Sequence, residues 1–366
     1  MIQLLREFPP GHGGVERIAH NLAVARGGIV FSLCRNHSLA RDPLPVSYQR
    51  CQLRSVPFGK FLLVLPSRTL WQLLASREPL LAHQPCPTVL ALSIFARVVS
   101  PRRSISFYWH AFVQRRSGVS GFLEQIYQQL AFRWLAGFSV ITTSPVLRDS
   151  LIRAGLPRSS VSVLPCSLPA QIETLLVSDR SKRRLTSQGR LIFIGRLDSY
   201  KRVDWLLDAF LKTPSARVLE ILGDGPDRFR LEKQALLHSR SDQSIRFHGR
   251  VSEDQKRILL SNSDLMVLPS NRCNEAFGIV QLEAMASGIP SLAFDLPRSG
   301  MHWVSALPAL DWTGRPEDLS LVMEKVLSND KLFPLLCCQA SERFDHMFSQ
   351  IVWHRQLSVV LQSFHD

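Results

Sequence analysis

Two basic side chains, Arg196 and Lys201, stand in the stretch IGRLDSYKR (194–202), which follows a short run of apolar, β-forming residues. A loop that leaves a strand can aim both cationic groups at one ligand. Two fixed cations can bind a diphosphate and stabilise its charge as it departs, in place of a metal ion. Arg and Lys are also the residues most often found as solvated surface charges, so this stretch alone leaves both interpretations open.

Two carboxylates, Glu275 and Glu283, stand eight residues apart in NEAFGIVQLEAMASGIP (274–290). We expect a helix from near Gly278, with Glu275 in the loop before it and Glu283 more than one turn inside. A carboxylate there could accept hydrogen bonds from two hydroxyls of one ribose. Because burying a bare carboxylate among apolar neighbours is costly, Glu283 must be either partnered or solvated. The alternative is an ordinary helix with two surface glutamates.

The start of the same helix offers backbone donors. The first amides of a helix have no partner inside it, and here they would belong to Phe277, Gly278 and Ile279. A phosphate or a sugar hydroxyl could satisfy them, since a helix start favours anions.

Glycines mark two further junctions. Gly13 and Gly14 in GHGGVERI (11–18) would let the backbone approach a phosphate at a helix start, although a plain tight turn fits equally well. Gly223 in LGDGPD (222–227) would let the backbone approach a flat ligand such as a base or ribose, or would simply join a strand to a helix. The sequence contains neither Gly-x-Gly-x-x-Gly nor a Walker A motif.

His110 ends the strand-like run SISFYWH (104–110). A histidine at the carboxyl end of a strand can form a hydrogen bond with a substrate hydroxyl or adjust the local charge. A packed or surface histidine is the alternative.

These residues lie where predicted strands pass into predicted helices. The second half alternates strands and helices, which predicts βαβ units and a parallel sheet covered on both faces. Strands are expected at 190–195, 216–222, 244–249 and 263–270, and helices at 201–212, 227–239, 252–262 and 277–287. The first half is similar but less regular, with strands at 27–34, 104–110, 138–144 and 161–169 and helices at 13–25 and 121–137. Residues 348–366 read as one amphipathic helix.

The predicted architecture is α/β, with two doubly wound Rossmann-like domains facing across a cleft, where ligands sit beyond the carboxyl ends of the strands. We place the first domain at 1–170, the second at 171–347 and a C-terminal helix at 348–366. Of the 44 Lys and Arg residues and the 30 Asp and Glu residues, residues 1–170 hold 19 and 6, a net charge of +13, so the rest carries +1. This asymmetry points to an anionic partner for the first half, unless it reflects a generally basic background.

The remaining composition narrows the class. No apolar run reaches 18 residues and the N-terminus lacks a signal-peptide pattern, so we expect a cytoplasmic protein. The seven cysteines are scattered, without Cys-x-x-Cys, and are expected to be reduced. Without His-Glu-x-x-His or Asp-x-Asp, no protein-held metal is predicted.

Together, several stretches resemble glycosyltransferase family 4, which comprises retaining enzymes of GT-B fold. The resemblance covers most of the chain. It rests on GGVER, FIGRLDSYKRVDWLLDAF, ILGDGP, RFHGRV and EAFGIVQLEAMASGIP, in that order. The last contains the Glu-x7-Glu motif, followed by Ala-x-Gly-x-Pro.

The resemblance implies roles for the residues above. The implied catalytic residues are His110, which contacts the transferred sugar, Arg196 and Lys201, which hold the diphosphate, and Glu275. The implied donor site comprises Gly13, Gly14, Arg196, Lys201, Gly223, Glu275, Phe277, Gly278, Ile279 and Glu283, the last on the ribose. The second domain would bind the nucleotide and the first the acceptor, and the C-terminal helix would cross back to the first.

The function so implied is metal-independent, retaining transfer of a sugar, of mannosyl or glucosyl type, from a nucleotide-sugar to a glycan or lipid-linked acceptor, as in polysaccharide or lipopolysaccharide synthesis. The nucleotide-sugar is a substrate, and no cofactor and no nucleic acid are expected. The protein could lie peripherally on an anionic membrane surface, with Arg102, Arg103, Arg115, Arg116 and the segment 60–77 as docking candidates.

The sequence departs from the pattern of family 4 at two places, and three other functions are alternatives to this hypothesis. Cys166-Ser167 stands where many relatives have Asn-Gly, and His302 stands where an acidic residue is expected. A nucleotide-sugar 2-epimerase of the same fold would release a free sugar without an acceptor. A nicotinamide dehydrogenase lacks its glycine fingerprint here, and a non-catalytic polyanion-binding protein would leave the Arg-Lys pair and the two glutamates unexplained.

Overall fold

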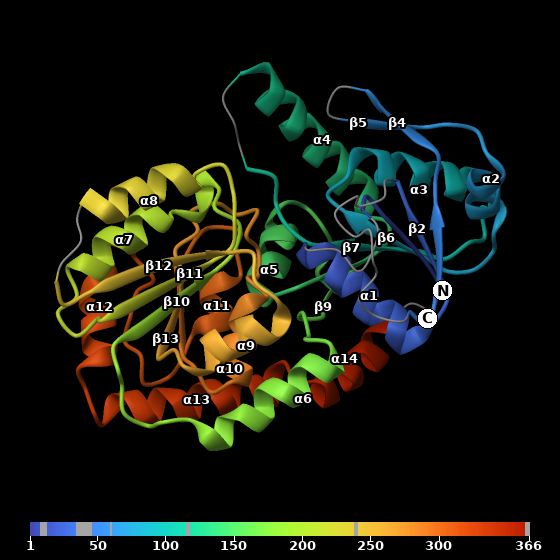
Figure 1. Ribbon diagram of the computed structural model, residues 1–366. Helices are drawn as coiled ribbons and strands as arrows, with labels where there is room; N and C mark the ends of the chain where they lie inside the picture. The colour runs from blue at the N-terminus through green and yellow to red at the C-terminus, as the bar shows by residue number, and fades with distance from the viewer. Residues whose placement is uncertain (8–12, 34–45, 59–60, 115–117, 238–240, 363–366) are drawn as a thin grey trace. The chain divides into compact units, whose positions relative to one another are not determined.

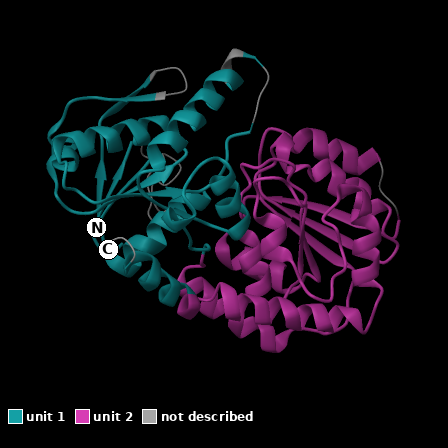
Figure 2. Cartoon of the chain, turned by 180° about the vertical axis from the view of Figure 1, so that it is seen from behind, with its two compact units in different colours: residues 1–166, 353–366 teal, residues 167–352 magenta. Residues whose placement is uncertain are grey.

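The computed structural model describes residues 1–7, 13–33, 46–58, 61–114, 118–237 and 241–362 (Figure 1). The chain forms two compact units (Figure 2). Unit 1 comprises residues 1–166 and 353–366, and unit 2 comprises residues 167–352. The expected divisions stood four and five residues away, after 170 and after 347.

Unit 1 is built on a parallel sheet. Its seven described strands follow the order β3–β2–β1–β6–β7–β8–β9. They are β1 (Ile2–Leu5), β2 (Ile29–Ser32), β3 (Gln49–Gln52), β6 (Leu80–Gln84), β7 (Ile105–Trp109), β8 (Ser139–Thr142) and β9 (Val161–Val163). Strands β4 (Ser55–Phe58) and β5 (Phe61–Val64) form a separate antiparallel pair.

The helices of unit 1 connect these strands, as parallel neighbours require. They are α1 (Gly14–Arg26), α2 (Arg68–Ala75), α3 (Pro87–Val99), α4 (Val119–Leu135), α5 (Pro145–Arg153) and the 3₁₀ turn η1 (Arg158–Ser160). Helix α14 (Gln350–Gln362) begins in unit 2 and belongs to unit 1 from Trp353 onward.

Unit 2 contains a second parallel sheet, with the described strands in the order β12–β11–β10–β13–β14. They are β10 (Arg190–Ile194), β11 (Val218–Leu222), β12 (Ser244–Gly249), β13 (Leu265–Leu268) and β14 (Ser291–Ala293). The helices are α6 (Ala170–Asp179), α7 (Val203–Leu211), α8 (Arg228–Leu237), α9 (Glu253–Ser261), α10 (Val280–Ala286), α11 (Met301–Ser305), α12 (Leu319–Leu327) and α13 (Leu332–Met347), with 3₁₀ turns η2 (Arg180–Lys182), η3 (Ser199–Lys201) and η4 (Pro316–Asp318).

Helices cover both faces of the unit 2 sheet (Figure 1). Helices α7 and α8 lie on one face, and α9, α10 and α13 lie on the other. The inner strands β10 and β13 are almost entirely apolar, as expected for a parallel sheet shielded from water on both sides. Leu191, Ile192 and Phe193 of β10 are fully buried, as are all four residues of β13. Each sheet therefore forms a rigid base for the loops at its carboxyl edge.

Two helices begin later than the sequence suggested, for one physical reason. Arg202 has φ 51° and Gly278 has φ 68°, and a left-handed residue cannot continue a right-handed helix. Helix α7 consequently begins at Val203, which leaves Lys201 in a 3₁₀ turn, and α10 begins at Val280. The expectation that Glu283 lies more than one turn inside its helix is therefore wrong, because Glu283 belongs to the first turn.

In the part of the chain that the structure describes, no helix is both long and apolar enough to span a bilayer.

Candidate functional site

The carboxyl edge of the unit 2 sheet has a topological switch point between β10 and β13. These two strands are neighbours, but the chain goes from β10 toward β11 and from β13 toward β14, in opposite directions. The loops that follow them therefore lead in opposite directions, and α/β proteins bind ligands at such switch points, beyond the carboxyl ends of the strands. The loop after β10 carries Arg196 and Lys201, and the loop after β13 carries Glu275.

Lys201 and Glu275 form an ion pair at this point, 74 residues apart in sequence. Lys201 is only 7% exposed. Burial is the largest influence on the pKa of Lys201 and lowers it, but the neighbouring Glu275 carboxylate and other nearby groups raise it by more. The net pKa lies above its ordinary value, so the ammonium group is charged at neutral pH. The structure thus brings the two junctions together, and Lys201 is a largely desolvated cation.

Tyr200, Asn271 and Arg272 support this pair, and sequence reasoning missed all three. The Lys201 ammonium group lies 5.4 Å from the Tyr200 ring centre, and the Arg272 guanidinium lies 6.0 Å from it. The backbone amide of Asn271 donates to the Tyr200 carbonyl at 2.9 Å, which ties the two loops together. The aromatic ring thereby gathers two cations beside one carboxylate.

Arg196 does not join the pair in this structure. Its side chain is 69% exposed, and its Nε lies 3.0 Å from a carboxylate oxygen of Asp198 in its own loop. The expected pairing of Arg196 with Lys201 around a diphosphate would require the Arg196 side chain to leave Asp198. At an exposed site such a rearrangement is cheap, because exposed ion pairs contribute little.

Gly223 and Gly225 allow two loops to pack together. Gly223 has φ 131°, and a Cβ at this position would overlap the carbonyl oxygen of Gly195. A Cβ at Gly225 would collide with the backbone of Leu197, whose amide donates to the Asp224 carbonyl at 3.0 Å. The backbone approach expected at Gly223 is therefore made to the loop that leads to Arg196, and its contact with a ligand remains a prediction.

The amides of Phe277, Gly278 and Ile279 lie in the loop before α10. Within the described residues, none of them donates to a backbone or side-chain acceptor. The Phe277 ring is buried and contacts Trp303 and Phe348 edge-on. A Cβ at Gly278 would overlap the Leu268 side chain, so glycine is required there both for φ and for space.

Glu283 is buried beneath this loop, with 1% exposure. Lys256 of α9 reaches it, and the ammonium group lies 2.9 Å from Glu283 Oε2 and 3.1 Å from Oε1. Of the two states that sequence reasoning allowed, partnered or solvated, the carboxylate is partnered. A contact between Glu283 and a ribose stays a prediction, and Lys256 is a partner that no motif had indicated.

In unit 1, Gly13 and Gly14 stand at the start of α1, and residues 11 and 12 of the same motif lie outside the described residues. A Cβ at Gly14 would meet nothing within 4 Å, whereas one at Gly13 would overlap the Glu16 carboxylate. Glu16 is buried, and burial raises the pKa of its carboxyl group. Gly14 therefore has no packing reason to be glycine, which leaves open the predicted approach of a ligand.

His110 directly follows β7 and is 5% exposed. Its Nε2 lies 2.8 Å from Nδ1 of His83, and its ring stacks on Tyr108 with centres 4.3 Å apart. His110 thus belongs to a buried polar cluster at the carboxyl edge of the unit 1 sheet.

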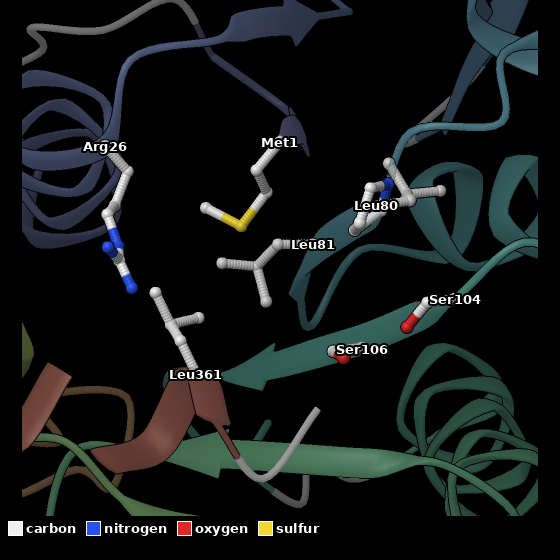
Figure 3. Close-up of a pocket in the computed structure, with 8 residues that line it drawn as sticks. Met1, Arg26, Leu80, Leu81, Ser104, Ser106 and Leu361 are labelled. Carbon is white, nitrogen blue, oxygen red and sulfur yellow. The ribbon is translucent and has the colours of Figure 1, made fainter. Parts of the chain in front are cut away.

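A cavity of about 310 Å³ opens at the other edge of this sheet (Figure 3). The residues that line this cavity include Met1, Arg26, Leu80 and Leu361. The residues that line it include none of those predicted to bind a ligand, so it is distinct from the sites described above.

His302 and Cys166, the two positions that depart from the pattern of family 4, each have a structural role. His302 Nδ1 lies 3.2 Å from the carbonyl oxygen of Ala293, and its ring meets Trp312 edge-on, so this side chain stabilises the loop after β14. Cys166 is buried, and burial raises the pKa of its thiol, which fits a packed, unreactive residue.

The expectation that Arg103 docks on a surface is wrong. The side chain is buried, and it donates hydrogen bonds to the carbonyl oxygens of Glu78 (2.7 Å) and Leu73 (2.6 Å). It therefore holds the end of α2 in place. Arg102 is exposed, whereas Arg115 and Arg116 lie outside the described residues. Within the segment 60–77, Leu63 and Trp71 are exposed apolar side chains.

Among the residues that the structure describes, no three His, Cys, Asp or Glu side chains gather in a way that could hold a metal ion.

Comparison with known proteins shows that this chain is similar to glycosyltransferases. Residues 178–332, most of unit 2, match the family model "Glycosyl transferases group 1". The chain is 24% identical over 359 residues to O-antigen chain mannosyltransferase C of Escherichia coli, covering 93% of this chain and 92% of the relative. It is 30% identical over 245 residues to phosphatidyl-myo-inositol mannosyltransferase of Mycobacterium leprae, covering 63% of this chain and 53% of that protein.

The crystal structure of Anabaena Alr3699/HepE in complex with UDP has a TM-score of 0.77 with this structure. It covers 99% of this chain and 100% of that chain at 16% sequence identity, so this likeness bears on the fold alone. The fold is GT-B, with two Rossmann-like α/β units, as the sequence predicted.

Proposed function

We propose that this protein is a retaining, metal-independent glycosyltransferase of family 4 that moves a hexosyl group from a nucleotide-sugar to a glycan or lipid-linked acceptor. The observation that carries this proposal is the buried Lys201–Glu275 pair at the switch point of unit 2, within the region that matches the group 1 model. Glu275 and Glu283 are then the two acidic residues of the Glu-x7-Glu motif.

Lys201 would stabilise the departing nucleoside diphosphate. Negative charge grows on the diphosphate as the glycosidic bond breaks, and a fixed cation near that charge lowers the barrier. Because Lys201 is desolvated, its attraction to this charge is stronger than that of a lysine in water. Arg196 would add a second cation after leaving Asp198, so the two residues together would replace a metal ion.

Glu275 would remain beside the reacting sugar. As Lys201 turns toward phosphate, the Glu275 carboxylate becomes free to accept hydrogen bonds from sugar hydroxyls, and the amides of Phe277, Gly278 and Ile279 offer donors in the same loop. None of these side chains acts as a covalent nucleophile in this proposal. The acceptor would attack on the face that the diphosphate leaves, as is usually proposed for the family.

Glu283 would contact the ribose. Its carboxylate has two oxygens with several acceptor positions, and the Lys256 ammonium group lies within 3.1 Å of both oxygens. Lys256 would therefore balance the charge of the buried Glu283 carboxylate while a ribose diol approaches.

The acceptor would bind to unit 1, whose excess of basic residues suits a phosphate-bearing glycan or lipid. Both relatives described above are named mannosyltransferases, which supports a mannosyl or closely related transfer in surface-polysaccharide synthesis. The exposed side chains of Leu63, Trp71 and Arg102 would suit peripheral binding to an anionic membrane from the cytoplasmic side.

A thermal-shift panel of UDP-, GDP- and ADP-sugars in the presence of EDTA tests the donor, because only a ligand that binds the folded state raises the melting temperature. We expect the nucleotide-sugars of one base to raise the melting temperature clearly. A 2-epimerase would in addition release a new sugar from that donor without any acceptor. No shift with any nucleotide-sugar would contradict the proposal.

A further inference from the structure

A line of buried polar side chains crosses three neighbouring strands of unit 1. Gln3 lies on β1, His83 on β6, and His110 at the end of β7. His83 Nε2 is 2.9 Å from Gln3 Oε1, and His83 Nδ1 is 2.8 Å from His110 Nε2. All three side chains are almost completely buried. In each of these hydrogen bonds one partner donates the hydrogen and the other accepts it. Which partner donates can be worked out from the group at the Gln3 end of the line.

The first direction is fixed by Ala19. Gln3 Nε2 lies 3.1 Å from the carbonyl oxygen of Ala19, and a carbonyl oxygen can only accept. The amide nitrogen of Gln3 must therefore face Ala19, and its oxygen must face His83. Because that oxygen is also only an acceptor, the hydrogen between Gln3 and His83 must reside on His83 Nε2.

The second direction follows from the charge of His83. Burial lowers the pKa of His83 to about 3, so its ring is neutral at pH 7 and carries one hydrogen. That hydrogen is already on Nε2, which leaves Nδ1 as a bare acceptor. The hydrogen between the two rings must therefore come from His110 Nε2. Burial first, and His83 second, also hold the pKa of His110 well below its ordinary value.

The line ends at an acceptor without a partner. His110 is neutral and carries its hydrogen on Nε2, so its Nδ1 is bare. Among the described residues this buried nitrogen has no hydrogen-bond partner. Tyr108, which stacks on His110, gives its own hydroxyl hydrogen to the Leu164 carbonyl at 2.6 Å, so it does not compete. A bare acceptor kept out of water is a cost that a ligand with a donor group would remove.

We propose that Gln3 and His83 are positioning residues that lock His110 in its Nε2–H tautomer, so that His110 Nδ1 accepts a hydrogen bond from a hydroxyl of the donor sugar. The choice of a sugar hydroxyl rests on the proposed function. The lock itself does not, since it follows from the hydrogen-bond geometry together with the neutral state of the two buried rings. A locked acceptor favours hydroxyl groups and rejects phosphate oxygens, which have no hydrogen to offer at neutral pH. It therefore orients the sugar.

The lock can be measured without a substrate. The full-length protein, labelled with ¹⁵N in its histidine rings, gives two nitrogen shifts per ring that separate protonated from bare nitrogens. Signals are assigned with His83→Asn and His110→Asn variants. We expect His83 and His110 of the wild-type protein to be Nε2–H tautomers at pH 7. An Nδ1–H signal from His110 would overturn the proposal.

Two variants of His83 separate positioning from packing. In His83→Asn the amide oxygen stands near the former Nδ1 and still accepts from His110, so the tautomer should persist. In His83→Leu the acceptor is lost, and His110 should become a mixture of tautomers. An unchanged His110 spectrum in a folded His83→Leu protein would show that His83 is only packing and would overturn the proposal. Should His83→Leu fail to fold, Gln3→Met replaces it, because losing the Gln3 acceptor frees the His83 tautomer and the same mixture is expected.

Activity provides the second arm. With the active nucleotide-sugar, His83→Leu should lower kcat/KM about tenfold, the effect of one lost hydrogen bond of about 1.4 kcal/mol, and His83→Asn should restore most of it. Equal losses in both variants would overturn the positioning role. A wild-type protein that shows the locked tautomer but transfers no sugar from any donor would instead contradict the proposed function.

Discussion

The carboxyl edges of the two sheets treat buried polar groups in opposite ways. In unit 2, the buried Lys201 and Glu283 are each paired with an oppositely charged side chain, Glu275 and Lys256 respectively. In unit 1, His83 and His110 give up their charge and connect through neutral hydrogen bonds. Both arrangements avoid a bare buried charge, which is the costly alternative. The difference matches the ligands proposed for each edge, which are a charged diphosphate in unit 2 and sugar hydroxyl groups in unit 1.

The largest effect should come from removing the buried cation. Lys201→Ala should lower kcat for sugar transfer by about 10²–10³-fold, the typical cost of losing one group that stabilises transition-state charge. Steady-state kinetics would measure this loss, and circular dichroism would verify the fold. Lys182→Ala is a matched control, because Lys182 is 80% exposed and should tolerate the change. Near-normal turnover of Lys201→Ala would mean that unit 2 uses its charge for structure only.

Glu283→Ala should weaken nucleotide binding and also lower the free energy of unfolding by about 2–3 kcal/mol, because the largely buried Lys256 ammonium group loses its buried partner and keeps the exposed Glu253 carboxylate, 2.7 Å away. Calorimetry would measure the binding and urea titration the stability. The control is Glu283→Ala combined with Lys256→Met, which should recover stability but not binding. If the affinity for nucleotide is the same in all three proteins, then Glu283 serves the fold alone.

The glycines of the two units should respond differently to a single methyl group. Gly223→Ala forces a Cβ into the Gly195 carbonyl at φ 131° and should destabilise unit 2 by about 2–3 kcal/mol. Gly14→Ala adds a Cβ in open space at the first position of α1, and stability should change by less than about 1 kcal/mol. Thermal unfolding would measure both. Similar losses of stability in the two variants would contradict the expected difference between Gly223 and Gly14.

The smallest effect concerns pH. The pKa of His83 is lowered in the folded protein, so the unfolded chain binds a proton that the folded chain does not. Stability from this group is therefore present above pH 6.5 and is lost as pH falls from 6.5 toward 3. The difference in unfolding free energy between the wild-type protein and His83→Asn should shrink over this range. A constant difference would show that His83 titrates normally in the folded state.

Sequence reasoning was most successful where the pattern is local. Strand–helix alternation predicted both parallel sheets, and it placed Lys201 and Glu275 after strands. That these two residues meet follows from the adjacency of β10 and β13, which the sequence did not predict. Sequence reasoning failed to predict the partners of side chains that are far apart in the sequence. Lys256 reaches Glu283 across 27 residues and His83 reaches Gln3 across 80, and no motif indicates such partners.

Local errors had a different origin. The left-handed conformations of Arg202 and Gly278 shortened two helices, and an arginine in that region is unusual enough that composition does not predict it. Arg103 looked like a surface charge because arginine usually is one, but two carbonyl oxygens compensate its burial.

The central claim is tested most directly by calorimetry in the presence of EDTA. The measurement compares the affinity of the wild-type protein and of Lys201→Ala for the nucleoside diphosphate of the active donor. The account predicts binding without metal in the wild-type protein and a loss of affinity of about 10²-fold in the variant, equal to about 2.7 kcal/mol. Binding that requires a divalent ion, or equal affinity in the two proteins, would contradict it.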